Sequence, residues 1–207
     1  MVTYPLSPPV SPGIRNLTMK PVTAVGVNVS PFTYSQEVQV SPGQQWGAEF
    51  DLPPMLRTQA AQWQAFMLAL NGPEGTFLMG DPDALAPQGL PTGAPVLDGV
   101  HDIGVRKISI KGLVALSVGN LIGGDVIQLG TGLDARMHRV LSSVDADATG
   151  KATVDIWPLI RTARADGLEV ITSSPMGLWR LASNEMGWKS NALGHHDIVV
   201  ECMEVVP

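Results

Sequence analysis

One stretch of the chain, residues 55–71, has the period of an amphipathic helix and constrains the fold more than any other. Its apolar positions recur at intervals of three and four residues: Leu56, Ala60, Trp63, Met67 and Leu70. This spacing places them on one face of a helix. Asn71-Gly72, followed by Pro73, is typical of a helix end. The sequence therefore predicts a short helix over 55–71 that packs on a sheet.

Strands are predicted on both sides of this helix. Trp46 to Phe50 alternates between two faces until Pro53-Pro54 stops the strand, and Thr76 to Met79 forms the next one. Almost all of the remaining sequence has the pattern of strand and loop, so we expect a mainly β fold: a β-sandwich-like domain with one packed α-helix. Eight side chains are expected to form its core: Trp46, Phe50, Leu56, Trp63, Phe66, Met67, Leu70 and Phe77.

The composition narrows the function classes. Charged residues make up 15% of the 207 residues, below the roughly 25% of ordinary soluble domains. This suits a subunit that buries surface in an assembly, although a monomer covered by uncharged polar side chains also fits. A net charge of −6 with scattered basic residues argues against binding nucleic acid through its phosphates.

Targeting and disulfide signals are not found. The sequence has no apolar run of 18 residues and no signal peptide, so we expect synthesis in the cytoplasm and no membrane insertion. Cys202 is the single cysteine, which excludes an internal disulfide and favours a buried thiol.

Residues 1–20 form a proline-rich N-terminal arm. It is either a frayed tail or an extended arm on a neighbouring subunit, because proline-rich segments lose little entropy when they dock. Its expected anchors are Tyr4, Leu6, Val10 and Ile14.

The next segments are predicted to form the first domain. We expect strands over 23–29 and 32–40, with a turn at Ser41-Pro42-Gly43 that leads back into the Trp46 strand. The last strand, 197–206, places four side chains on one side: Ile198, Val200, Cys202 and Glu204. It needs a sheet, and the strands around Trp46 and Phe77 are the expected hosts. The first domain is therefore predicted to be discontinuous, over 21–82 and 183–207.

A second domain is predicted between these two parts. Residues 83–104 are rich in Pro, Gly and Ala and are interpreted as a linker. Short strands separated by turn residues then recur about every ten residues over 105–182, ending with one at 178–181. This pattern predicts an inserted small β-barrel.

Recognisable catalytic chemistry is missing from the sequence. No phosphate-binding loop, dinucleotide fingerprint, nucleophile elbow or zinc-protease motif is present, so we predict no catalytic residues, no cofactor and no metal site. His195 and His196 are expected in an exposed turn, His101 in the linker, and His138 at a surface or interface. The acidic pairs Asp81/Asp83 and Asp145/Asp147 favour turns over calcium sites.

The order of these segments resembles a known protein family. It consists of SPFTYSQEVQVSPGQQWGAEFDLPPM, the helix RTQAAQWQAFMLALNG, then EGTFLMGDPD and a closing DIVVECMEVV. This order is similar to that of the distal tail proteins and lambda-type minor tail proteins of long-tailed bacteriophages. The stretches GDVIQLGTG and RMHRVLSSVDADATGKATVDIWPLIR resemble the barrel insertion of related phage tail proteins.

The resemblance implies a structural role in the virion. Such proteins form a ring, commonly a homohexamer, that joins the tail tube to the hub and receptor-binding proteins of the tail tip, or baseplate. DNA would pass through the channel without specific binding, and the barrel would be a platform for other tail-tip proteins. Candidate interface residues are Tyr4, Ile14, Trp188, Val200 and Met203.

Three other functions stay open. The chain could be a tail tube or tip accessory subunit. It could carry a carbohydrate-binding module on the barrel, with Trp179 or Trp188 as the platform. A hydrolase would need a carboxylate pair or a triad that only folding brings together.

Overall fold

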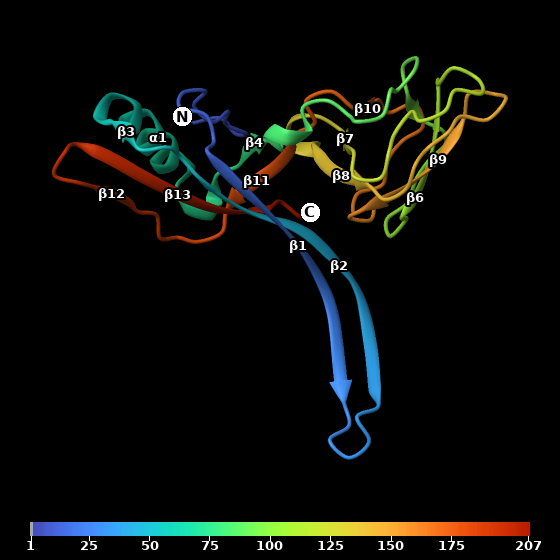
Figure 1. The fold of residues 1–207 in the computed structure, drawn as a ribbon, viewed down its shortest axis with the longest axis horizontal. Coiled ribbons are helices and arrows are strands. Elements are labelled where there is room, and N and C mark those ends of the chain that lie inside the picture. The colour runs from blue at the N-terminus through green and yellow to red at the C-terminus, as the bar shows by residue number, and fades with distance from the viewer. Residues whose placement is uncertain (1) are drawn as a thin grey trace.

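The computed structural model describes residues 2–207 and confirms a mainly β fold. These residues contain one α-helix and two sheets, and the second sheet is a nearly closed, barrel-like sheet of six strands. The helix-bearing unit and the barrel lie at opposite ends of an elongated body, and a long hairpin projects away from it (Figure 1).

The first sheet runs in the order β1-β2-β13-β11-β4, and β3 and β12 also pair with β13. Its strands are β1 (Asn16–Val29), β2 (Gln36–Asp51), β3 (Met55–Leu56), β4 (Phe77–Met79), β11 (Gly177–Leu181), β12 (Trp188–Ser190) and β13 (His195–Glu204). The second sheet runs β10-β7-β8-β9-β6-β5. Its strands are β5 (Val96–Leu97), β6 (Lys107–Lys111), β7 (Val126–Leu129), β8 (Arg136–Val140), β9 (Ala152–Trp157) and β10 (Val170–Ile171). Three short 3-10 helices are η1 (Gly72–Glu74), η2 (Pro82–Ala84) and η3 (Gly132–Asp134).

The helix α1 (Arg57–Leu70) packs its apolar face on the first sheet. It ends at Asn71, which takes the left-handed conformation with φ of 51°. Its buried residues are Ala60, Trp63, Phe66, Met67 and Leu70. Together with Trp46, Phe50 and Phe77 they belong to the main core of the first unit. The rings of Trp63 and Phe66, and those of Phe66 and Phe77, meet nearly at right angles.

The expectation that Leu56 belongs to this core is wrong. Leu56 is 59% exposed, whereas its neighbour Met55 is buried. Both residues lie in β3, where successive side chains point to opposite faces. The helix predicted over 55–71 therefore begins two residues later, at Arg57, and ends at Leu70.

The predicted turn at Ser41-Pro42-Gly43 is also wrong. These residues lie inside β2, and the chain instead turns between β1 and β2, over residues 30–35. Thr23 pairs with Gln44 but Val25 pairs with Val40, so the three residues bulge opposite Ala24. A bulge tolerates proline because the ladder is interrupted there.

The last strand, β13, lies between β2 and β11. The Trp46 strand is therefore its neighbour, as expected, but β4, which contains Phe77, is not. The prediction that the strand at 178–181 belongs to the barrel is wrong, because as β11 it pairs with β13 and β4 in the first sheet. The proposed linker 83–104 contains β5, which pairs with β6 of the second sheet.

The N-terminal arm docks on its own chain. The Leu6 N–H donates to the Thr76 carbonyl at 2.8 Å, and the Leu78 N–H donates to the Leu6 carbonyl at 3.0 Å. The Tyr4 hydroxyl donates to the carbonyl of Ala69 in α1 at 2.8 Å. Neither expectation for the arm, a frayed tail or an arm on a neighbour, holds for this segment.

Candidate functional site

The hairpin of β1 and β2 extends beyond the sheet from which it grows (Figure 1). β13 pairs with β2 only over Gly47 to Asp51, and β1 is the last strand of the sheet order. Within residues 2–207, the outer edge of β1 and the distal edge of β2 therefore have no strand partner. Such edges present unpaired backbone donors and acceptors to any strand that approaches.

The distal hairpin has two chemically different faces. Residues paired across an antiparallel ladder point to the same side. The pairs Val25↔Val40, Val27↔Val38 and Val29↔Gln36 gather five valines on one side, each 45–75% exposed. We name Val25, Val27, Val29, Val38 and Val40 the valine face. The opposite, polar face carries Gly26, Asn28, Glu37 and Gln39.

The tip of the hairpin presents two aromatic rings on an ordered loop. Phe32 is 91% exposed and Tyr34 is 79% exposed. The Ser30 N–H donates to the Ser35 carbonyl and the Tyr34 N–H donates to the Ser30 carbonyl, both at 2.9 Å. Tyr34 has a φ of 55°, a conformation rare for a residue with a bulky side chain. The loop thus holds its rings outward in a defined shape.

A pocket of about 480 Å³ lies where the hairpin leaves the body. Six of the residues that line it are Val22, Ala24, Pro42, Ile103, Leu159 and Arg161. We name this the base pocket. Hairpin residues form one of its walls, residues of the second unit form another, and its lining is mainly apolar.

Charged side chains fix the second unit to the base of the hairpin. The Arg161 guanidinium forms an ion pair with Glu204 of β13 and donates to the Gln44 carbonyl of β2 at 2.6 Å. Glu204 also accepts the Trp46 N–H at 3.1 Å. Burial raises the pKa of Glu204, and the charge of Arg161 opposes this rise. These contacts join Arg161, which lines the base pocket, to both β2 and β13.

His138 is buried, and its expected place at a surface or interface is wrong. It lies on β8 and contacts the Pro158 carbonyl through Nδ1 at 2.7 Å. Burial lowers the pKa of His138 to about 3. The neutral His138 ring donates this hydrogen bond, and the ring does not face solvent where it could act as a base.

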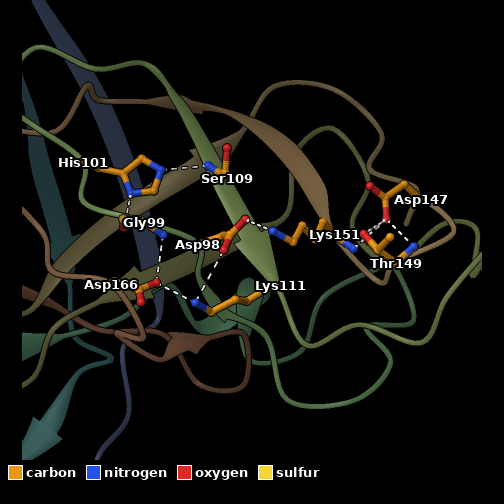
Figure 2. A network of polar contacts seen from close by, with 9 residues as sticks. All are labelled: Asp98, Gly99, His101, Ser109, Lys111, Asp147, Thr149, Lys151 and Asp166. Carbon is orange, nitrogen blue, oxygen red and sulfur yellow. Dashed lines mark hydrogen bonds and ion pairs between the residues drawn. The ribbon is translucent and has the colours of Figure 1, made fainter.

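A polar network on the barrel surface is built from ion pairs, as Figure 2 shows. Lys111 Nζ lies 2.6 Å from Asp166 and 3.5 Å from Asp98, and Lys151 Nζ lies 2.7 Å from Asp98. The hydrogen bond from Lys151 lowers the pKa of Asp98. These contacts tie strand β6 to the loops beside it, so the network has a structural explanation.

His101 belongs to the same region (Figure 2) and both of its ring nitrogens have backbone partners. Nε2 accepts the Ser109 N–H at 2.8 Å and Nδ1 donates to the Gly99 carbonyl at 3.1 Å. The ring therefore fastens the loop before β6 to that strand instead of facing a substrate.

The two acidic pairs form turns. Asp81 accepts the Asp83 N–H at 3.0 Å, and Asp147 accepts the Thr149 N–H at 2.7 Å. In the described part of the chain, no three His, Cys, Asp or Glu side chains are arranged to hold a metal ion. No helix within 2–207 has the length and apolar character needed to cross a membrane.

Several candidate interface residues already have partners within the chain. Tyr4 and Ile14 are partly buried and pack against the first core, and Val200 is buried in it, so of these three only Val200 is enclosed by its own chain. Met203 is half-buried, and Trp188 on β12 is 41% exposed.

Three further predictions concern exposure. His195 and His196 are half-buried at the start of β13, not in an exposed turn, because they pair with β3. Trp179 is fully buried in the first sheet, so it offers no sugar platform on the barrel. Trp188 also lies outside the barrel, on β12.

Sequence reasoning missed the hairpin as a functional element. Its signal is present: valines alternate with small or polar residues over 25–29 and again over 38–40. The hairpin was missed because Ser41-Pro42-Gly43 has the composition of a turn. This composition predicts two separate strands where the structure has the single strand β2.

Comparison of the chain with models of known protein families gives no match, and no curated protein matches it.

Proposed function

We propose that this protein is a structural subunit of a bacteriophage tail tip that assembles into a ring, joining the tail tube to the hub and the receptor-binding proteins. The observation that carries the proposal is the long hairpin with free edges and an exposed valine face. The resemblance of the segment order to distal tail proteins supplies the biological setting.

The hairpin favours an assembled state on physical grounds. A two-stranded ribbon alone is marginally stable in water, and exposed strand edges invite pairing. In a ring related by rotation, each neighbouring copy would cover exposed surface of this hairpin. Closure of the ring would then leave no copy with an uncovered hairpin.

The charge of the chain is compatible with a DNA channel. The net charge is −6, and the polar face of the hairpin carries one acid, Glu37, and no base. A channel with such a lining would let DNA pass without binding it. We propose six copies in each ring, assembly in the host cytoplasm, and no catalytic activity, cofactor or membrane insertion.

The proposal is tested by locating the chain in virions. Electron cryo-microscopy of tails should show one ring of this protein between the tube and the hub, and light scattering should show oligomers of the purified protein. A copy number equal to that of the tube would instead identify a tube subunit. Tails without this chain would overturn the proposal.

A further inference from the structure

We propose that the hairpin of one copy docks on a second copy of this chain, with its valine face buried and Phe32 inserted into the base pocket of that copy. This rests on the proposed function only in assuming that copies of the chain assemble. The inference specifies the buried face of the hairpin, the side chain that anchors it and the pocket that receives this side chain.

The two faces of the ribbon determine which side is covered. Val27 and Val38 are paired and both are 55% exposed, and the ladder continues the same face to Val25, Val29 and Val40. Burial of apolar surface drives association, whereas Asn28, Glu37 and Gln39 on the other side would lose water contacts. The valine face is therefore the side that a partner covers.

The aromatic tip is unusual for this chain. The sequence has four Phe and two Tyr residues, and Phe50, Phe66 and Phe77 are buried while Tyr4 packs against the core. Phe32 and Tyr34 alone among the six are left in solvent. Exposed aromatic residues on an ordered loop have the character of binding anchors, because little entropy is lost on docking.

The base pocket matches this anchor in size and chemistry. Its volume of about 480 Å³ admits a phenyl ring, and Val22, Pro42 and Leu159 give it an apolar wall. Arg161 also lines it, and a guanidinium is attracted to the face of an aromatic ring.

Phe32 cannot reach the base pocket of its own copy, so the docking that we propose is between copies. The pocket lies at the base of the hairpin and Phe32 at its tip, and the ladder over 25–29 and 36–40 keeps the two ends apart. A tip-to-base contact is heterologous, because each copy offers a tip on one side and a pocket on the other. Such contacts generate rings or open filaments.

The first experiment compares matched variants by light scattering over a range of concentrations. V27T/V38T keeps β-branched side chains of the same shape but makes the valine face polar, and F32S removes the anchor. Each should raise the concentration needed for assembly by about tenfold or more. The control N28T/Q39T changes the polar face at neighbouring positions and should assemble as the wild type does.

A second experiment joins the two surfaces directly. Oxidation of the F32C/I103C variant should give covalent dimers and higher species, whereas F32C or I103C alone should not give the ladder. Cys202 is buried and does not compete. Circular dichroism and the unfolding midpoint establish that each variant is folded.

The outcomes separate this inference from the proposed function. A wild type that stays monomeric at all concentrations, assembly unchanged in V27T/V38T and F32S, or no covalent dimer from oxidised F32C/I103C would overturn the inference. A tail-tip ring seen in virions would leave the proposed function standing in each of these cases. Loss of assembly in the variants, together with tails that lack the chain, would support the inference and overturn the function.

Discussion

The indole rings of Trp46 and Trp157 meet edge to face, with their centroids 4.4 Å apart and their planes at 83°. Trp46 lies on β2 of the first sheet and Trp157 ends β9 of the barrel, so the contact joins the two units. Trp46 also donates through Nε1 to the Met137 carbonyl of β8 at 3.1 Å. The base of the hairpin is thereby held against the barrel.

Replacement of Trp157 by Ala should weaken this contact between the first sheet and the barrel. We expect W157A to lower the free energy of unfolding by about 3 kcal/mol, since the ring leaves a cavity beside Trp46. Denaturant titration followed by circular dichroism measures the change. The matched control is W188A. The Trp188 ring is more exposed, on β12, so its removal should lower the free energy of unfolding by less than about 1 kcal/mol. Equal effects of the two changes would show that this contact does not contribute to stability.

The Arg161–Glu204 ion pair should behave as a buried unit. Removing one partner leaves the other charge in a site with little water. R161M and E204Q should therefore each lower the free energy of unfolding by about 3–5 kcal/mol. In a double-mutant cycle, R161M/E204Q should lower the free energy of unfolding by much less than the sum of the two single-variant losses. The exposed pair Lys20–Glu49 is the control, and K20M should leave the unfolding midpoint nearly unchanged. Additive losses at Arg161 and Glu204 would contradict this account.

Periodicity in the sequence explains how far the fold could be predicted. The helix face from Ala60 to Leu70 and the alternation of β13 from Ile198 to Glu204 are local patterns, and the structure has both. Sheet order is a different matter, because it depends on which strands pair across long separations. β11 has the same apolar pattern as the barrel strands, and only its pairing with β13 and β4 assigns it to the first sheet.

The candidate site could not be predicted for a related reason. Ser41-Pro42-Gly43 has the composition of a turn, and only the partner strand shows that it is a bulge opposite Ala24. The base pocket draws Val22 and Leu159 together from distant parts of the chain. No local pattern contains such a juxtaposition.

The docked N-terminal arm should depend on Tyr4. Y4F removes the hydrogen bond from the Tyr4 hydroxyl to the Ala69 carbonyl and should lower the free energy of unfolding by about 1 kcal/mol. Hydrogen exchange at the Leu6 amide, which is bonded to Thr76, should quicken, because it reports whether the arm stays in place. V10A is the control on the same arm, since Val10 is almost fully exposed. Unchanged exchange in Y4F would show that Leu6 docks without this anchor.

His138 should make the stability of the protein depend on pH. Burial lowers its pKa from 6.5 to about 3 in the folded state. The unfolded chain therefore binds a proton that the folded chain does not, over the window between these two values. The stabilising effect of the neutral ring is complete above pH 6.5 and is lost as the pH falls through this window, by about 1.4 kcal/mol for each pH unit.

Denaturant titrations of wild type and H138Q between pH 4 and 7 measure this effect. The glutamine amide has no proton to gain in this range and can still donate to the Pro158 carbonyl, so the slope of stability against pH should fall by about one proton. V140A is the matched control, because Val140 is buried on the same strand and does not titrate. It should lower stability without changing the slope. A slope in H138Q equal to that of the wild type would show that His138 is not the group that loses its proton on folding.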